Sequence, residues 1–215
     1  MSAEKLETEV RQAQILRVAM QLVSEDGLKA LSLANIARRV GVVPSALYRH
    51  FKSKEALLDA LLEFIAEKLL DNVNLVCRET SDPVERLRRL LFLHVKLIRE
   101  NRGIPGIPRI IFSPEFFATC PRRKKRLYGA IREYLNRIGG IIDEGRQQGL
   151  IRQECAPETL SMLFLGLIQP AAFLWYLSDG AFDVTKHAER AWKVFRESLE
   201  GGKESGDDST RVASR

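Results

Sequence analysis

The chain of 215 residues has few of the residue types that build metal sites, disulfides or catalytic centres. It contains three cysteines and three histidines, and neither type recurs at the short spacing of a zinc site or a CxxC motif. An odd number of widely separated cysteines also argues against a disulfide framework. No serine–histidine–aspartate grouping and no glycine-rich phosphate loop is visible. The sequence therefore predicts a protein that is not an enzyme and binds no metal and no cofactor.

The chain also lacks an apolar N-terminal segment and has only one long uncharged run. Residues 1–9 are charged, so no secretory signal is expected. The run Leu160–Leu177 has 18 residues without a charge, which is long enough to raise a membrane span. Gln169 and Pro170 lie at its centre, and anchoring aromatic and basic residues do not flank it on both sides. We expect a buried helix of a soluble, cytoplasmic protein.

Strand-like alternation is absent from the sequence, whereas apolar residues recur at spacings of three and four. With 45% apolar and 29% charged residues, a chain of this length buries a sizeable core. The pattern predicts an all-α fold with an irregular connector over 103–114. The expected helices are 8–25 (capped by Thr8), 33–40, 44–50, 54–77, 83–100, 121–148, 157–177 and 183–200.

One window carries charge of a single sign, although the net charge of the chain is only +6. Gly27–Lys54 holds six basic residues and no acidic one. DNA favours such a segment because each neutralised phosphate releases counterions. Ala37 lets two helices cross closely, and Gly41 accepts the positive φ of the turn between them. The window predicts a helix-turn-helix whose second helix, 44–50, enters a major groove; a purely structural helical hairpin is the alternative.

Residues 11–58 resemble the N-terminal DNA-binding domain of the TetR family of bacterial transcriptional regulators. The most specific part of the resemblance is the run Leu-Tyr-Arg-His-Phe-Lys-Ser-Lys-Glu at 47–55. Beyond it, the chain matches the family in length and helical character. The resemblance implies a three-helix helix-turn-helix domain over residues 1–53, joined to a helical ligand-binding and dimerisation domain over 54–200. The glycine- and serine-rich segment 201–215 is expected to be a disordered tail.

The resemblance also assigns DNA contacts to residues of this chain. Residues that match phosphate contacts of the family are Ser32, Tyr48, His50 and Lys54. Residues that start the recognition helix and face the bases are Pro44, Ser45 and Ala46. The family usually has serine or threonine at position 43, so a cap-to-phosphate contact is not expected from the valine that stands here.

Three arginines are added to the DNA-binding set from their charge and position alone. Arg38 and Arg39 end the first helix of the motif, and Arg49 lies in the second. Arg49 has two open interpretations, a bidentate contact to guanine or a contact to phosphate.

The last two helices carry the expected dimer interface. The helix over 157–177 is apolar nearly all round, and one chain's core covers only one stripe of it. The rest has to face a second subunit, a pocket, or both. In the family, the last two helices form a four-helix bundle with their two-fold mates. The resemblance thus implies a homodimer with the interface residues Phe164, Leu167, Ala171, Trp175, Trp192 and Phe195.

A ligand pocket is expected between the middle helices, as in the family. Pro170 removes a backbone hydrogen bond from its helix, and Gln169 beside it needs a polar partner. Both features suit a pocket wall, and a kink filled by packing is equally compatible. For His94, in an apolar helix, a satisfied structural histidine is the favoured interpretation. The candidate ligand-binding residues are His94, Ile98, Tyr134, Met162, Gln169 and Phe173.

These features together predict a homodimeric transcriptional regulator, in the first place a repressor that a small hydrophobic or amphipathic ligand releases from a palindromic DNA operator. The alternative is a DNA-binding protein of the same fold without an inducer, acting as an activator or a chromosome organiser. A helical enzyme or lipid carrier is disfavoured by the missing catalytic constellation. The protein is expected to be bacterial and nucleoid-associated, without membrane contacts. The basic run 122–126 is interpreted as the solvated start of a helix rather than a nucleic-acid patch.

Overall fold

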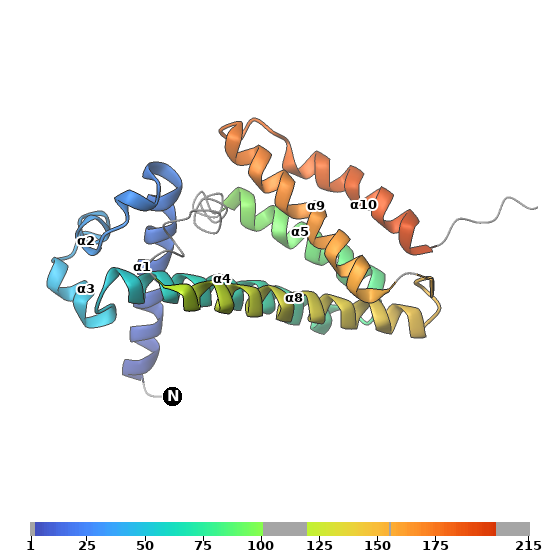
Figure 1. Cartoon of the computed structure of the whole chain (residues 1–215), viewed down its shortest axis with the longest axis horizontal. Helices are drawn as coiled ribbons and strands as arrows, with labels where there is room; N and C mark the ends of the chain where they lie inside the picture. The colour runs from blue at the N-terminus through green and yellow to red at the C-terminus, as the bar shows by residue number, and fades with distance from the viewer. Residues whose placement is uncertain (1–2, 101–119, 155, 201–215) are drawn as a thin grey trace, which may run out of the picture.

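The computed structural model describes residues 3–100, 120–154 and 156–200, and every regular element in these ranges is a helix (Figure 1). The predicted all-α fold is confirmed. The expected connector 103–114 and the tail 201–215 lie outside the described residues. The elements are α1 (Ala3–Asp26), the 3-10 helix η1 (Leu28–Ala30), α2 (Leu33–Val40), α3 (Pro44–His50), α4 (Lys54–Glu79), α5 (Pro83–Glu100), α8 (Pro121–Gln147), α9 (Pro157–Leu177) and α10 (Val184–Glu200).

Most helix ends lie at the predicted residues or within two of them, and α1 is the exception. It begins at Ala3, so Thr8 is an interior residue and the prediction that it caps the helix is wrong. Residues 3–7 are mostly good helix formers, which lets the helix extend toward the N-terminus. At α10, Asp183 is the cap rather than a helical residue: its Oδ1 accepts the backbone N–H of Lys186 at 2.9 Å.

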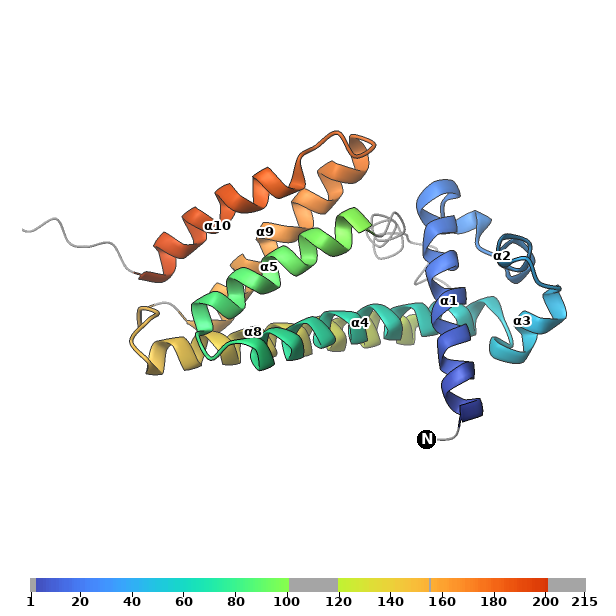
Figure 2. The same ribbon diagram turned by 180° about the vertical axis from the view of Figure 1, so that it is seen from behind.

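Buried apolar side chains form two separate clusters that share α4. The first cluster joins α1, α2 and α3 to the N-terminal half of α4, where Leu57 and Leu61 are almost fully buried. The second cluster joins the C-terminal half of α4, from Val73 on, to α5, α8, α9 and α10. Figures 1 and 2 show α4 and α8 lying along one another, with α1, α2 and α3 at one end. The helix-turn-helix is thus presented at the end of the molecule, and α4 connects it to the rest.

Candidate nucleic-acid interface

The first helix of the motif, α2, is fixed at both ends by the residues that the sequence singled out. The Ser32 hydroxyl accepts the backbone N–H of Asn35 at 3.1 Å, which caps the helix. Gly41 ends it with φ 78°, and its N–H donates to the Ala37 carbonyl at 2.9 Å. The Ala37 side chain is fully buried. The close crossing and the left-handed turn that the sequence predicts are therefore present.

The recognition helix α3 has one buried side and one exposed side. Leu47 packs into the N-terminal core, as does Phe51 just after the helix. Ser45 and Arg49 are exposed, and the Tyr48 side chain is 51% exposed. This outer face carries hydroxyl and guanidinium groups that can hydrogen-bond to base edges or phosphates.

The start of α3 has the weak cap that the sequence predicts. Val43 occupies the N-cap position without a side-chain hydrogen bond, and Pro44 stands in the first turn. Proline compensates in part because it has no N–H to satisfy and its φ is already helical. The side chains of Ala46 and His50 are half-buried, which limits what they present to a ligand.

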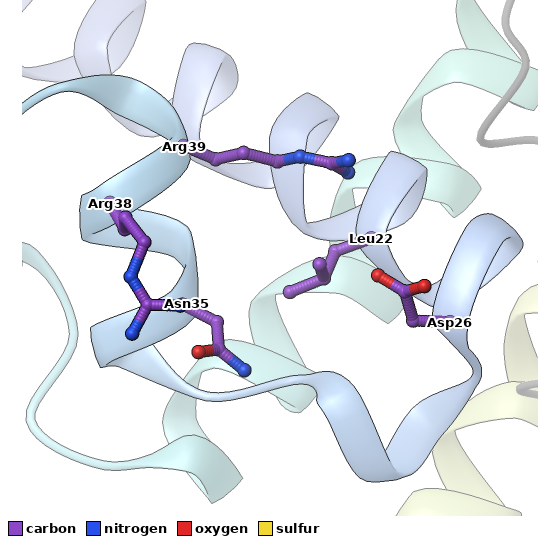
Figure 3. A pocket seen from close by; sticks show the side chains of 5 residues that line it. All are labelled: Leu22, Asp26, Asn35, Arg38 and Arg39. Atoms are coloured by element: carbon purple, nitrogen blue, oxygen red, sulfur yellow. The ribbon is translucent and has the colours of Figure 1, made fainter.

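The basic residues around α2 differ in how they are held. Arg38 is exposed, whereas Arg39 forms an ion pair with Glu25 at the end of α1. Figure 3 shows both arginines around a hollow of about 260 Å³ that Asp26 of α1 also lines. The hollow therefore carries charges of both signs. Lys54, at the first position of α4, donates from Nζ to the carbonyl of Leu28 at 3.4 Å, which holds its ammonium group beside the motif.

The buried polar pair of the C-terminal core is fully satisfied within the chain. His94 Nδ1 lies 2.7 Å from the Leu90 carbonyl, so this nitrogen carries the proton, and His94 Nε2 accepts the Tyr134 hydroxyl at 2.8 Å. Burial lowers the pKa of His94 to about 4 and raises the pKa of Tyr134. Ile98 is buried one turn further along α5. This is the geometry of a structural histidine.

The structure separates the two halves of the predicted ligand site. Met162 and Phe173 are 59% and 47% exposed, and Gln169 is exposed as well, so none of them faces the core that holds His94 and Tyr134. The two sets of candidate residues therefore do not line one pocket, because Met162, Gln169 and Phe173 lie on the outer side of α9. A ligand-binding role for either set stays a prediction.

The described residues do form a different hollow in the C-terminal part, between α5 and α10. Its volume is about 390 Å³. Its lining residues are Phe92, Val95, Lys96, Arg99 and Thr185.

The predicted interface residues are largely buried within the single chain. Phe164, Ala171, Trp192 and Phe195 are all buried and belong to the chain's own core, where the ring centroids of Phe164 and Phe195 lie 5.7 Å apart. Leu167 and Trp175 are partly buried against the same core. Side chains that the chain's own core buries present little surface to a second subunit, and the predicted interface stays a prediction at these positions.

The outer side of α9 offers a surface that the monomer leaves uncovered. Its exposed apolar residues form two groups on one side of the helix, one toward each end: Met162 and Leu163, then Phe173, Leu174 and Leu177. We call this set the α9 stripe. By length and composition α9 could cross a membrane, with 28% of its most apolar window buried in the chain. The same exposure is what a helix shared between two subunits shows.

One charged side chain is buried, contrary to the prediction from the sequence. Arg123 belongs to the basic run 122–126, which the sequence predicts to be solvated, yet its side chain is 0% exposed. Its Nε donates to Asp59 Oδ1 at 2.7 Å and its Nη2 to the Glu55 carbonyl at 3.1 Å, so it ties the start of α8 to the start of α4. Nothing in the local sequence distinguishes Arg123 from its basic neighbours. Only its partner on α4 does.

No metal-binding cluster of three or more histidine, cysteine or acidic side chains occurs in the described ranges. The two cysteines that the structure describes, Cys77 and Cys120, are unpaired thiols of intermediate burial.

Two family models together match most of the chain. The model of "Bacterial regulatory proteins, tetR family" matches residues 15–61, and that of "Tetracyclin repressor-like, C-terminal domain" matches residues 80–199. Among curated relatives, the nucleoid occlusion factor SlmA of Serratia proteamaculans is 33% identical over 150 residues, which cover 70% of this chain and 72% of the relative. SlmA of Vibrio vulnificus is 28% identical over 185 residues, or 86% of this chain and 93% of the relative.

Solved structures share the fold over nearly their whole length. The transcriptional regulator FadR from Bacillus subtilis, in complex with stearoyl-CoA, superposes with a TM-score of 0.73 at 19% identity and covers 87% of this chain and 98% of its own. A TetR/AcrR-family regulator from Thermobifida fusca has a TM-score of 0.61 at 27% identity, covering 86% and 96%.

Proposed function

Because this chain belongs to the tetR family of bacterial regulatory proteins and is a DNA-binding regulator, we propose that it acts as a homodimeric repressor on a palindromic operator. The observation that carries the proposal is the recognition helix. Its inner side is anchored by Leu47, and its outer side presents Ser45 and Arg49 to solvent. A helix held in this way can enter a major groove without rearranging the domain.

In this proposal, the DNA-contact residues divide into two roles. Ser45 and Arg49, with Pro44 and Ala46 at the helix start, lie against base edges. Residues that contact phosphates are Ser32, Arg38, Arg39, Tyr48, His50 and Lys54. Arg39 has to exchange its ion pair with Glu25 for a phosphate, which makes it a weaker candidate than Lys54.

The α9 stripe supports the homodimer. Two-fold pairing along α9 would cover five large apolar side chains that the monomer exposes to water, and burial of such area is the main driving force of association. The dimer would then hold two copies of α3 about 34–36 Å apart, one turn of B-DNA. The interface that we propose is therefore formed by the α9 stripe, whereas Phe164 and Ala171, on the other side of α9, pack in the chain's own core.

Release of the operator by a small hydrophobic or amphipathic ligand is the second part of the proposal. It is supported by the match of residues 80–199 to a tetracycline-repressor-like domain. Within the described residues, the hollow between α5 and α10 has the amphipathic lining that such a ligand needs, with Phe92 and Val95 beside Lys96 and Arg99.

A second candidate function is a DNA-binding protein without an inducer that marks positions on the chromosome. The specific observation in its favour is the 33% identity to a nucleoid occlusion factor over 72% of that relative. In both candidates, the protein is a cytoplasmic, nucleoid-associated homodimer.

Selection of bound sequences from a random DNA pool, followed by mapping of the selected motif and of bound sites on the host chromosome, tests the proposal. A repressor should yield a palindrome found at a few promoters, whose genes rise in expression when the protein is removed. Sites spread over the chromosome without change in transcription would favour the second candidate. Failure to select any sequence over random DNA would refute both.

A further inference from the structure

The first turns of α8 carry a basic surface that the helix-turn-helix does not account for. No acidic residue occurs between positions 121 and 132, and Arg122, Lys124 and Lys125 are all exposed. Arg126 is different, because it faces Asp59 and Glu63 of α4. Among the residues that the structure describes, the three exposed cations form no ion pair. We call these three residues the α8 basic face.

Buried contacts hold the α8 basic face against the DNA-binding domain. Arg123, in the middle of the run, is fully buried and bonded to Asp59 and to the Glu55 carbonyl on the first turns of α4. Leu127, one turn later, packs against the N-terminal core cluster. Because Arg123 points inward, its neighbours in the helix have to point outward. The exposure of the α8 basic face is therefore built into the docking of α8.

The start of α8 is level with the start of α4. Arg123 of α8 contacts Asp59 of α4, and Arg137 of α8 contacts Asn74 of α4. The two helices thus advance together in the same direction, as Figure 1 shows. Lys54, the proposed phosphate contact, is the first residue of α4. The α8 basic face consequently lies near the start of α4, which begins at Lys54, at the end of the molecule that carries α2 and α3 (Figure 1).

The charge pattern of this turn opposes helix stability. Cations near a helix N-terminus are unfavourable because the backbone N–H groups there are already positive. The first turns of α4, α5 and α9 each hold an acidic residue, respectively Glu55, Glu85 and Glu158, whereas the first turn of α8 holds none. The first turns of α2, α3 and α10 likewise hold no acidic residue, so the feature peculiar to α8 is the run of five cations at 122–126. Folding does not favour such a run at a helix N-terminus, which points to a role other than folding.

We propose that the α8 basic face is a second DNA-contact surface, which binds backbone phosphates of the duplex that flanks the half-site read by the same protomer. This inference rests on the proposed operator binding. The contacts are to phosphates, so they add affinity without sequence preference. Each phosphate neutralised would add about 0.9 to the magnitude of the salt slope. The operator would then be recognised by α3 and the adjoining duplex held by α8.

The test compares two duplexes that carry the selected operator. One ends at the operator edges, and the other extends it by about 15 base pairs, roughly 50 Å, on each side. The full-length protein should bind the long duplex about tenfold more tightly. Arg122→Ala/Lys124→Ala/Lys125→Ala should lose this gain, keep the affinity for the short duplex, and lower the salt slope on the long duplex by about 2 to 3 per protomer.

A matched control removes the same charge elsewhere. Arg78→Ala/Arg132→Ala/Lys186→Ala replaces three exposed cations further from the reading end, and it should keep the preference for the long duplex. The melting temperature of the α8 variant should stay the same or rise, because unfavourable charges leave the helix start.

The outcomes separate this inference from the proposed function. If the wild-type protein binds both duplexes equally, or if the α8 variant keeps the gain, the second contact surface does not exist. If the control variant loses the gain as the α8 variant does, the effect is one of net charge and the inference is overturned as well. If neither duplex binds more tightly than random DNA of the same length, the proposed operator binding is itself refuted.

Discussion

The ion pair between α4 and α8 permits a quantitative prediction about stability. Asp59→Asn keeps the shape of the side chain and an acceptor oxygen but removes the negative charge beside Arg123. Because the Arg123 side chain is 0% exposed, its guanidinium would remain buried without its counter-charge. Breaking a fully buried pair costs about 3–5 kcal/mol. Asp59 is 31% exposed, so water shares part of the interaction, and we expect a loss of about 2 kcal/mol.

Arg126→Ala provides the matched control, since it removes a second arginine that faces the same carboxylate. Arg126 is 55% exposed and lies 3.6 Å from Asp59 Oδ2 and 3.5 Å from Glu63 Oε1. Exposed pairs of this kind contribute about 0.2–1 kcal/mol. The large difference between the two expected losses therefore follows from burial rather than from charge.

Urea unfolding at a fixed protomer concentration measures both variants. With an m-value of about 2 kcal/mol/M, Asp59→Asn should lower the unfolding midpoint by about 1 M and Arg126→Ala by about 0.2 M. Arg123→Lys should fall between them, because lysine keeps the charge but not the fork of donors that reaches both Asp59 and the Glu55 carbonyl. Equal shifts for Asp59→Asn and Arg126→Ala would refute the reasoning, since burial would then make no difference.

Three further predictions concern the reading head, the dimer and pH. Lys54→Ala should weaken binding to operator and random DNA alike and lower the salt slope by about one unit. Ser45→Ala should instead change the ranking of operator variants in anisotropy titrations. Equal losses of affinity for operator and random DNA in Ser45→Ala would make Ser45 a contact to the DNA backbone. Leu174→Glu places a charge on the α9 stripe, so sedimentation should show a folded monomer, and an intact dimer would put the interface elsewhere. The pKa of His94 is about 4 in the fold, below its ordinary 6.5, so the unfolded chain takes up the proton first and the free energy of unfolding should fall as pH drops from 6.5 to 4. His94→Gln should flatten that decline, and an unchanged pH profile of the variant would contradict it.

The local sequence was sufficient for the elements whose signals lie within a few residues of one another. The bounds of α2 follow from a capping serine and a terminating glycine, and both make the expected hydrogen bonds. The weak start of α3 follows from Val43 and Pro44 in the same way. The DNA-binding set could be proposed from charge and motif because its residues lie within one short window, Gly27–Lys54.

Arg39, in the same window, has a partner that its charge and motif position do not predict. Its charge and place in α2 suggested a phosphate contact, but the side chain pairs with Glu25 of α1. Two residues fourteen positions apart meet only because η1 and the turn before α2 bring the helices together. Sequence spacing alone does not contain that contact.

What the sequence by itself determined is that α9 is a helix and that one core cannot cover all of its apolar sides. Which side faces inward was decided by the tertiary structure. Phe164 and Ala171 pack against the chain's own core, while Leu163 and Leu174, equally apolar, stay outside. Helical periodicity fixes the angles between side chains around the helix axis. In a helix that is apolar all round, however, it does not determine the rotation of the helix about that axis, and therefore not which side turns toward the core. That rotation is set by α5, α8 and α10, which lie elsewhere in the chain. The burial of Arg123 is likewise set by a segment distant in sequence, the first turns of α4.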